Sequence, residues 1–152
     1  MTRRAALATI SAPLFAQTHL NEDAEIMKAL DAFMNGWNSG DVAKYADALH
    51  FPHLILDGGR YFEYSNREDF VAKGKAHWDR VPNEWHHSVW EERRIVQRLG
   101  DTAHVAGRWA RKDSAGRVFQ RADVVYVVFK KEGRWKIFAR SGSRETQRSQ
   151  TA

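Results

Sequence analysis

The sequence predicts an α+β domain in which three helices pack on the concave face of a cone-shaped, curved antiparallel sheet of about four to six strands. Apolar residues follow helical spacing through most of the first half of the chain, and they alternate with polar residues from residue 84 onward. Turns at residues 100–101, 114–116 and 132–133 divide this second part into strands. Because helices gather early and strands late, the two kinds of element are expected to segregate.

Composition indicates one globular domain of 152 residues, with 43% hydrophobic residues and six tryptophans. The absence of cysteine excludes disulfides, a thiolate nucleophile and a zinc site with sulfur ligands. The formal charge of +5 comes from basic residues that are interspersed with acidic ones, without a recognition-helix or aromatic-platform motif. We therefore expect no nucleic-acid partner, and we expect no metal and no cofactor.

Residues 1–20 differ in kind from the rest of the chain. A basic start at residues 2–4 precedes an uncharged, mostly small or apolar stretch over residues 5–15. This pattern fits either a short export signal or an N-terminal extension, so both an exported and a cytoplasmic protein remain open. The stretch is too short to cross a bilayer, and no membrane association is expected. Residues 21–143 form the predicted domain, and the polar residues 144–152 a loose tail.

Local signals predict three helices before residue 82. Asn21 is expected to cap the first, whose apolar stripe comprises Ile26, Met27, Leu30, Phe33, Met34 and Trp37. Gly40 ends this helix, and Asp41 caps a second short one. Ser65 and Glu68 have the spacing of a capping box for the third helix.

A strand is predicted between the second and third helices, over residues 51–59. Alternation places His53, Ile55 and Asp57 on one of its faces. Residues 60–64 return as a short strand after Gly58-Gly59. Four further strands are expected over residues 85–99, 102–111, 118–130 and 135–141.

Three segments together resemble the nuclear transport factor two-like superfamily. They are residues 36–41, residues 45–59 and the terminal hairpin at residues 124–137. The similarity covers about residues 22–142 and is strongest to the SnoaL-like polyketide cyclase and ketosteroid isomerase branch. It implies a cone-shaped barrel with an apolar pocket, a small apolar or polyketide/steroid-like ligand, and a homodimer. The superfamily includes isomerases, cyclases, hydrolases and non-catalytic binding domains, so membership leaves activity open.

The resemblance implies roles for three residues. Asp57 lies where the isomerase branch has its general base, and Tyr126 occupies the position of its protonated acid. His53 is a candidate orienting group because it shares a strand face with Asp57. Each has a structural alternative, since Asp-Gly pairs form turns, and tyrosine and histidine are also found in cores. The first helix lacks the tyrosine that the branch uses, so a typical steroid isomerase is not expected.

Four aromatic residues are candidate walls of the ligand pocket: Phe33, Trp37, Tyr61 and Trp78. The leading hypothesis is a small-molecule-binding protein that catalyses proton transfer as an isomerase, cyclase or hydrolase. The alternative is a non-catalytic ligand-binding or dimeric interaction domain.

Two further sets of residues are assigned to the surface. Arg121 and Asp123 have the two-residue spacing of limonene epoxide hydrolases, but the last predicted strand lacks a second acid, so we interpret them as a surface or interface pair. Trp85, Val89 and Trp109 are expected on the outer face of the sheet, where a second copy of the chain would bury them.

Overall fold

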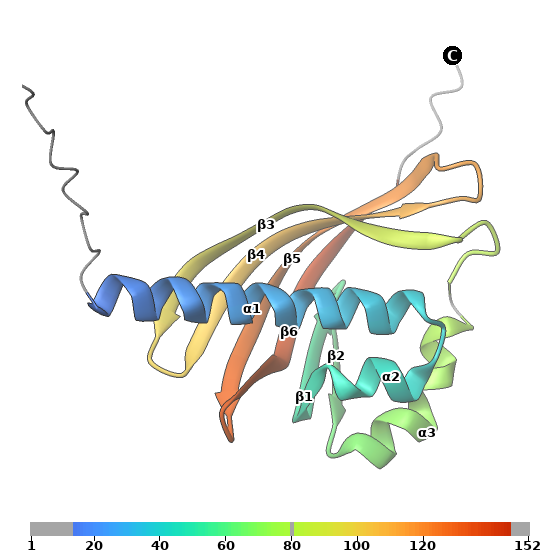
Figure 1. The fold of residues 1–152 in the computed structure, drawn as a ribbon. Helices are drawn as coiled ribbons and strands as arrows, with labels where there is room; N and C mark the ends of the chain where they lie inside the picture. Colours follow the sequence, from blue (N-terminus) through green and yellow to red (C-terminus); the bar gives the residue numbers. More distant parts are fainter. Residues whose placement is uncertain (1–13, 80, 147–152) are drawn as a thin grey trace, which may run out of the picture.

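The computed structural model describes residues 14–79 and 81–146. These residues form α1 (Leu14–Asn38), α2 (Val42–Asp47), β1 (Leu49–Asp57), β2 (Arg60–Tyr64), α3 (Arg67–Trp78), β3 (His87–Leu99), β4 (Thr102–Lys112), β5 (Val118–Lys131) and β6 (Arg134–Thr146). The sheet curves over α1, while α2 and α3 lie at the end that carries β1 and β2 (Figure 1). The predicted α+β class, with helices on the concave face, is confirmed.

The sheet has six strands in the order β2-β1-β6-β5-β4-β3, and it is open, with β2 and β3 at its edges. It is mixed rather than antiparallel, because β1 and β6 run parallel, with Leu54 opposite Ala139 and Asp57 opposite Gly142. Alternation along a strand shows which residues share a face, but it does not show which strand becomes the neighbour. Alternation in the sequence therefore could not predict that β1 and β6 pair in parallel. This pairing places the last strand beside the first.

Aromatic rings fill the space between the helices and the concave face of the sheet. Phe33 of α1 lies 4.9 Å from Tyr45 of α2 and 5.4 Å from Tyr126 of β5, measured between ring centroids. The Tyr45 ring in turn lies 5.5 Å from Phe70 of α3. Burying each such side chain contributes roughly 1.5–3 kcal/mol to folding. This core confirms the predicted apolar stripe of α1. It also holds α2 at the end of the sheet that carries β1 and β2 (Figure 1).

The predicted cap of α2 is confirmed, whereas the predicted cap of α3 is shifted by one residue. Asp41 caps α2, because its Oδ1 accepts hydrogen bonds from the backbone N–H groups of Ala43 (2.9 Å) and Lys44 (3.3 Å). At α3 the predicted Ser65–Glu68 box is wrong by one residue. Asn66 Oδ1 instead accepts from the Asp69 N–H at 2.8 Å, and Asp69 Oδ2 accepts from the Ser65 N–H at 3.2 Å. Serine and asparagine are similarly good caps, so local sequence did not separate the two registers.

Two predicted boundaries also move. The described part of α1 begins at Leu14, so Asn21 lies inside the helix and is not its N-cap. At the other end β6 continues to Thr146 and pairs with β5, with Arg121 opposite Glu145, so residues 144–146 are strand rather than loose tail. Most of the proposed export signal, and residues 147–152, lie outside the described residues. Among the helices that the structure describes, none combines the length and apolar character needed to cross a membrane.

Candidate functional site

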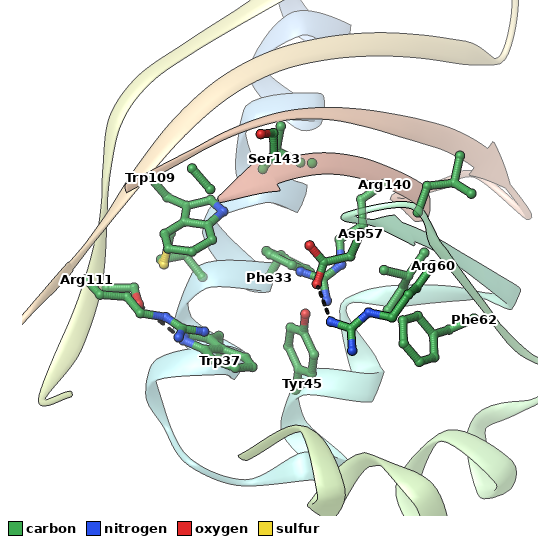
Figure 2. A pocket seen from close by; sticks show the side chains of 17 residues that line it. Phe33, Trp37, Tyr45, Asp57, Arg60, Phe62, Trp109, Arg111, Arg140 and Ser143 are labelled. Atoms are coloured by element: carbon green, nitrogen blue, oxygen red, sulfur yellow. Dashed lines mark hydrogen bonds and ion pairs between the residues drawn. The ribbon is translucent and has the colours of Figure 1, made fainter. Parts of the chain in front are cut away.

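A cavity lies under the concave face of the sheet, where α1 and α2 meet the strands (Figure 2). Its apolar lining includes Phe33, Met34, Trp37, Ile55, Phe62 and Trp109. Its polar lining includes Tyr45, Asp57, Arg60, Ser88, Arg111 and Arg140. The cavity volume is about 80 Å³, which is several times what one water needs. The cavity therefore has room for several waters or for a group of a small molecule.

Strand β1 delivers a carboxylate to this cavity. Its alternate residues His53 and Ile55 are buried, and the Asp57 side chain, which follows them on the same face, is 18% exposed. Gly58 and Gly59 then reverse the chain with positive φ angles of 58° and 78°, a conformation that glycine adopts without strain. The shared inward face predicted for these three β1 residues is present.

Two arginines lie near the Asp57 carboxylate. Arg60 Nη2, beyond the turn, is 3.9 Å from Asp57 Oδ2. Arg140 comes from β6, the parallel neighbour of β1, and its guanidinium lies 5.8 Å from the centroid of the Phe33 ring. Burial disfavours charge on Arg140, whereas neighbouring acidic groups favour it, among them the Asp57 carboxylate, and the pKa of Arg140 lies above its ordinary value. Arg140 is therefore cationic.

Tyr45 of α2 contributes a phenol to the same region. Its side chain is 2% exposed, and Figure 2 shows its hydroxyl directed toward Asp57. Burial raises the pKa of the Tyr45 phenol, with Arg140 opposing this effect, so the hydroxyl is protonated at neutral pH and can donate a hydrogen bond. Sequence reasoning sought a tyrosine in the first helix and missed this one. The available signal was a polar-tipped aromatic at a buried position of the next helix.

The opposite end of the cavity holds a cluster of one arginine and two tryptophans. Arg111 of β4 is only 5% exposed, and its guanidinium lies 5.4 Å from the Trp37 ring and 5.2 Å from the Trp109 ring. Its Nη1 donates a hydrogen bond to Gln120 Oε1 at 3.0 Å. Trp109 therefore faces the cavity, and its predicted place on the outer face of the sheet is wrong. Two indole faces enclosing one guanidinium provide a flat, cationic recognition surface.

Ser88 of β3 connects this cluster to the helices. Its Oγ accepts hydrogen bonds from the indole Nε1–H groups of Trp37 (3.2 Å) and Trp85 (3.0 Å). The Asn38 side chain exchanges two hydrogen bonds with the Ser88 backbone, each 2.8 Å long. Trp85 consequently packs against Trp37, with ring centroids 5.9 Å apart, and is not an outer-face residue as predicted. By alternation, Val89 lies opposite Ser88, on the outer face.

A family model described as NTF2-like protein (DUF6841) matches residues 22–145. The chain belongs to this NTF2-like family. No curated protein shows significant similarity to it.

Solved structures show the same NTF2-like fold. A protein of unknown function with a cystatin-like fold from Nostoc punctiforme is 16% identical, with a TM-score of 0.71 over 85% of this chain and 95% of that one. A ketosteroid isomerase-like protein from Erwinia carotovora is 17% identical, with a TM-score of 0.63 over 81% and 95%. A structure from Catenulispora acidiphila in complex with S-DNPA is 17% identical, with a TM-score of 0.66 over 82% and 94%. The superfamily expected from the sequence is thereby confirmed.

Two predicted catalytic residues of the NTF2-like domain lie in the core. His53 is fully buried against Phe70, with ring centroids 6.1 Å apart. Tyr126 is fully buried between Phe33 and Trp90, and burial raises its pKa. Neither is among the residues that line the cavity. The structure therefore brings Asp57 to the cavity without its two predicted partners, because alternation gives the face of a strand and not how far the cavity extends along it.

Two of the four predicted wall residues line the cavity, and a third does not. Phe33 and Trp37 line the cavity, whereas Tyr61 is 57% exposed and donates a hydrogen bond to Glu63 Oε2 at 2.7 Å. Phe62 lines the cavity in its place. Both neighbours on β2 are aromatic, so composition did not show which one faces inward. The side chain of Trp78, the last residue of α3, lies outside the described part of the structure.

Arg121 and Asp123 do not form a pair. Asp123 Oδ1 accepts a hydrogen bond from Arg108 Nε at 2.7 Å, and Arg121 Nε lies 3.0 Å from Glu91 Oε2. Both pairs are solvent-accessible and do not line the cavity. Within the described residues, no three histidine or carboxylate side chains are grouped as metal ligands.

Proposed function

We propose that this NTF2-like domain binds a small molecule in the cavity and catalyses proton transfer on it, with Asp57 as general base. One observation carries the proposal: the Asp57 carboxylate from β1 and the Tyr45 phenol from α2 both line the same cavity. An acceptor and a donor from separate elements are the minimum that a proton-transfer site requires.

The proposed reaction is abstraction of a proton from carbon next to a carbonyl group. Asp57 takes the proton, the C–H electron pair forms the enolate, and negative charge develops on the carbonyl oxygen. Tyr45 donates a hydrogen bond to that oxygen, and the Arg140 guanidinium stabilises its charge. The proton then returns to another atom of the same molecule. A positioned base of this kind contributes about 10²–10⁴-fold to a rate.

Two similarities support the proposal. The Erwinia protein of this fold is ketosteroid isomerase-like, and the Catenulispora structure was solved in complex with S-DNPA. The cavity of the present chain differs from the apolar pocket expected from the sequence, because charged groups line both of its ends. Proton transfer here would therefore use cationic stabilisation of the enolate rather than a protonated acid.

Deuterium exchange tests the proposal directly. The protein is incubated in D₂O with 2-tetralone or a related aryl ketone, and loss of the α-proton signal is followed by NMR. We expect saturable exchange that Asp57→Asn reduces at least 100-fold and Tyr45→Phe reduces about tenfold. Asp123→Asn, which changes a carboxylate outside the cavity, is the matched control and should leave the rate unchanged. Equal exchange by wild type and Asp57→Asn would remove Asp57 as the base.

The alternative is a non-catalytic ligand-binding domain, and the 3.9 Å approach of Arg60 to Asp57 favours it. In that case the carboxylate is held in an ion pair, and it positions a ligand without removing a proton. Native mass spectrometry of the freshly purified protein distinguishes the two proposals, when combined with the exchange assay. A retained compound that undergoes no exchange would support binding alone.

We also propose the homodimer that the family resemblance implies. Trp85 and Trp109 do not support it, since both face inward, so the proposal rests on the family resemblance. Sedimentation velocity at micromolar concentration tests it, and a single monomeric species would refute it.

A further inference from the structure

The charges around the cavity are unbalanced. Among the described residues that line it, three are arginines, Arg60, Arg111 and Arg140, and one is an acid, Asp57. Charges of one sign in a partly enclosed, low-dielectric space focus the field and attract counter-ions. An electrically neutral ligand would leave this excess uncompensated, whereas an anion would balance it.

The end of the cavity near Arg111 offers hydrogen-bond donors. A serine hydroxyl has two acceptor lone pairs and one donor hydrogen. At Ser88 the indole N–H groups of Trp37 and Trp85 already donate to Oγ and occupy both lone pairs. The hydroxyl can therefore still donate one hydrogen bond. Arg111, which has no acceptor atoms in its side chain, lines the same cavity.

We propose that the ligand is an organic acid with a flat apolar body, whose carboxylate binds at Ser88 and Arg111. This inference rests on the proposed function and names the substrate class for the same cavity. A planar guanidinium matches a carboxylate in a two-point hydrogen-bonded geometry, and the apolar residues that line the cavity, Phe33 and Ile55 among them, can contact an aromatic or alicyclic body.

The layout of the cavity orients such a ligand. Figure 2 shows Arg111 and Asp57 on opposite sides, with Phe33 and Trp109 between them. A carboxylate bound at the Arg111 end therefore directs the far end of the molecule toward Asp57. The C–H group that Asp57 attacks then belongs to the part of the substrate remote from its charge.

Isothermal titration with three probes of similar shape tests the anion preference. The probes are 2-naphthoate, the neutral 2-naphthamide and 2-naphthylmethylammonium, each at low and at moderate salt. We expect naphthoate to bind at least tenfold more tightly than the amide and the ammonium compound to bind most weakly. The ratio of the naphthoate and amide affinities should decrease as the salt concentration rises.

Variants locate the carboxylate. Ser88→Ala should weaken naphthoate binding about fivefold and leave the amide less affected, because one donor is lost. Arg111→Gln should remove the naphthoate preference, and Arg111→Lys should retain part of it. Arg108→Gln removes an exposed arginine outside the cavity and should change nothing. Thermal melting of each variant confirms folding, and the wild-type comparison of the three probes depends on no variant.

The outcomes separate this inference from the proposed chemistry. Equal affinity of the wild type for naphthoate and naphthamide, preference for the ammonium probe, or no binding of any probe would each overturn the anion site. Deuterium exchange on a neutral ketone without a charge preference would keep the base and refute the anion site. Naphthoate preference without exchange on any ketone would keep the anion site and refute the base.

Discussion

Replacing Gly36 with alanine tests whether close contact between α1 and α2 positions Tyr45. A Cβ atom at Gly36 would lie 2.8 Å from Tyr45 Cα and 3.0 Å from the Lys44 carbonyl oxygen. Ordinary van der Waals contact begins near 3.4 Å, and both of these atoms belong to the backbone. The side chain of alanine therefore fits only if α2 moves by several tenths of an ångström, and Tyr45 moves with it.

Two opposing effects set the change in the free energy of unfolding that Gly36→Ala causes. Overpacking in a tight contact costs roughly 1–3 kcal/mol. Alanine favours the helix over glycine by about 1 kcal/mol, which offsets part of that cost. We expect a net loss near 1 kcal/mol in the free energy of unfolding, which lowers the Tm of a domain of this size by about 2–4 °C.

Urea unfolding followed by tryptophan fluorescence measures the loss. Asn35→Ala is the matched control, because it changes an exposed neighbour on the same helix and gains helix propensity without the contact. Naphthoate affinity of Gly36→Ala should also fall, since Tyr45 lines the cavity. If Gly36→Ala is stabilised as much as Asn35→Ala, α2 adapts without cost, and the reasoning about Tyr45 is refuted.

Three further predictions concern stability. Tyr126→Phe should stabilise the fold by roughly 1 kcal/mol, since the Tyr126 hydroxyl is buried without a hydrogen-bond partner among the described residues; a loss of stability would show a missed partner. Asp41→Ala should cost about 1 kcal/mol in urea unfolding and Asp41→Asn much less, because Asp41 caps α2. Burial lowers the pKa of His50 below 6.5, so the folded state binds fewer protons than the unfolded state just below that pH. Stability should therefore fall as pH drops through this window, and His50→Gln should flatten the decline in Tm measured across it.

The features that sequence predicted correctly are those encoded locally. Alternation along β1 placed Asp57 on the inward face, and the side chain of Asp41 marked the start of α2. Such signals need only a few neighbouring residues. They identified the fold class, the carboxylate at the end of β1, and two cavity walls, Phe33 and Trp37.

The cationic part of the site came from pairing between distant strands, which local patterns do not encode. Arg140 lies near Asp57 because β6 pairs in parallel with β1, far away in sequence. Arg111 faces inward although basic residues in a strand ordinarily indicate a solvated surface. The same ambiguity put Trp109, two residues before Arg111, on the wrong face.

The inward arginines are the strongest indication that the cavity serves a ligand and not only the fold. Removing a guanidinium from water costs several kcal/mol, and contact with an aromatic face returns about 0.5–2 kcal/mol of it. Arg111 lies against Trp37 and Trp109, and Arg140 against Phe33, so each is partly compensated in this way. Apolar side chains would fill the same volume at a smaller cost. At Arg140 the neighbouring acidic groups, Asp57 among them, already favour the charge, so we propose that the cost a bound anion offsets is the one at Arg111.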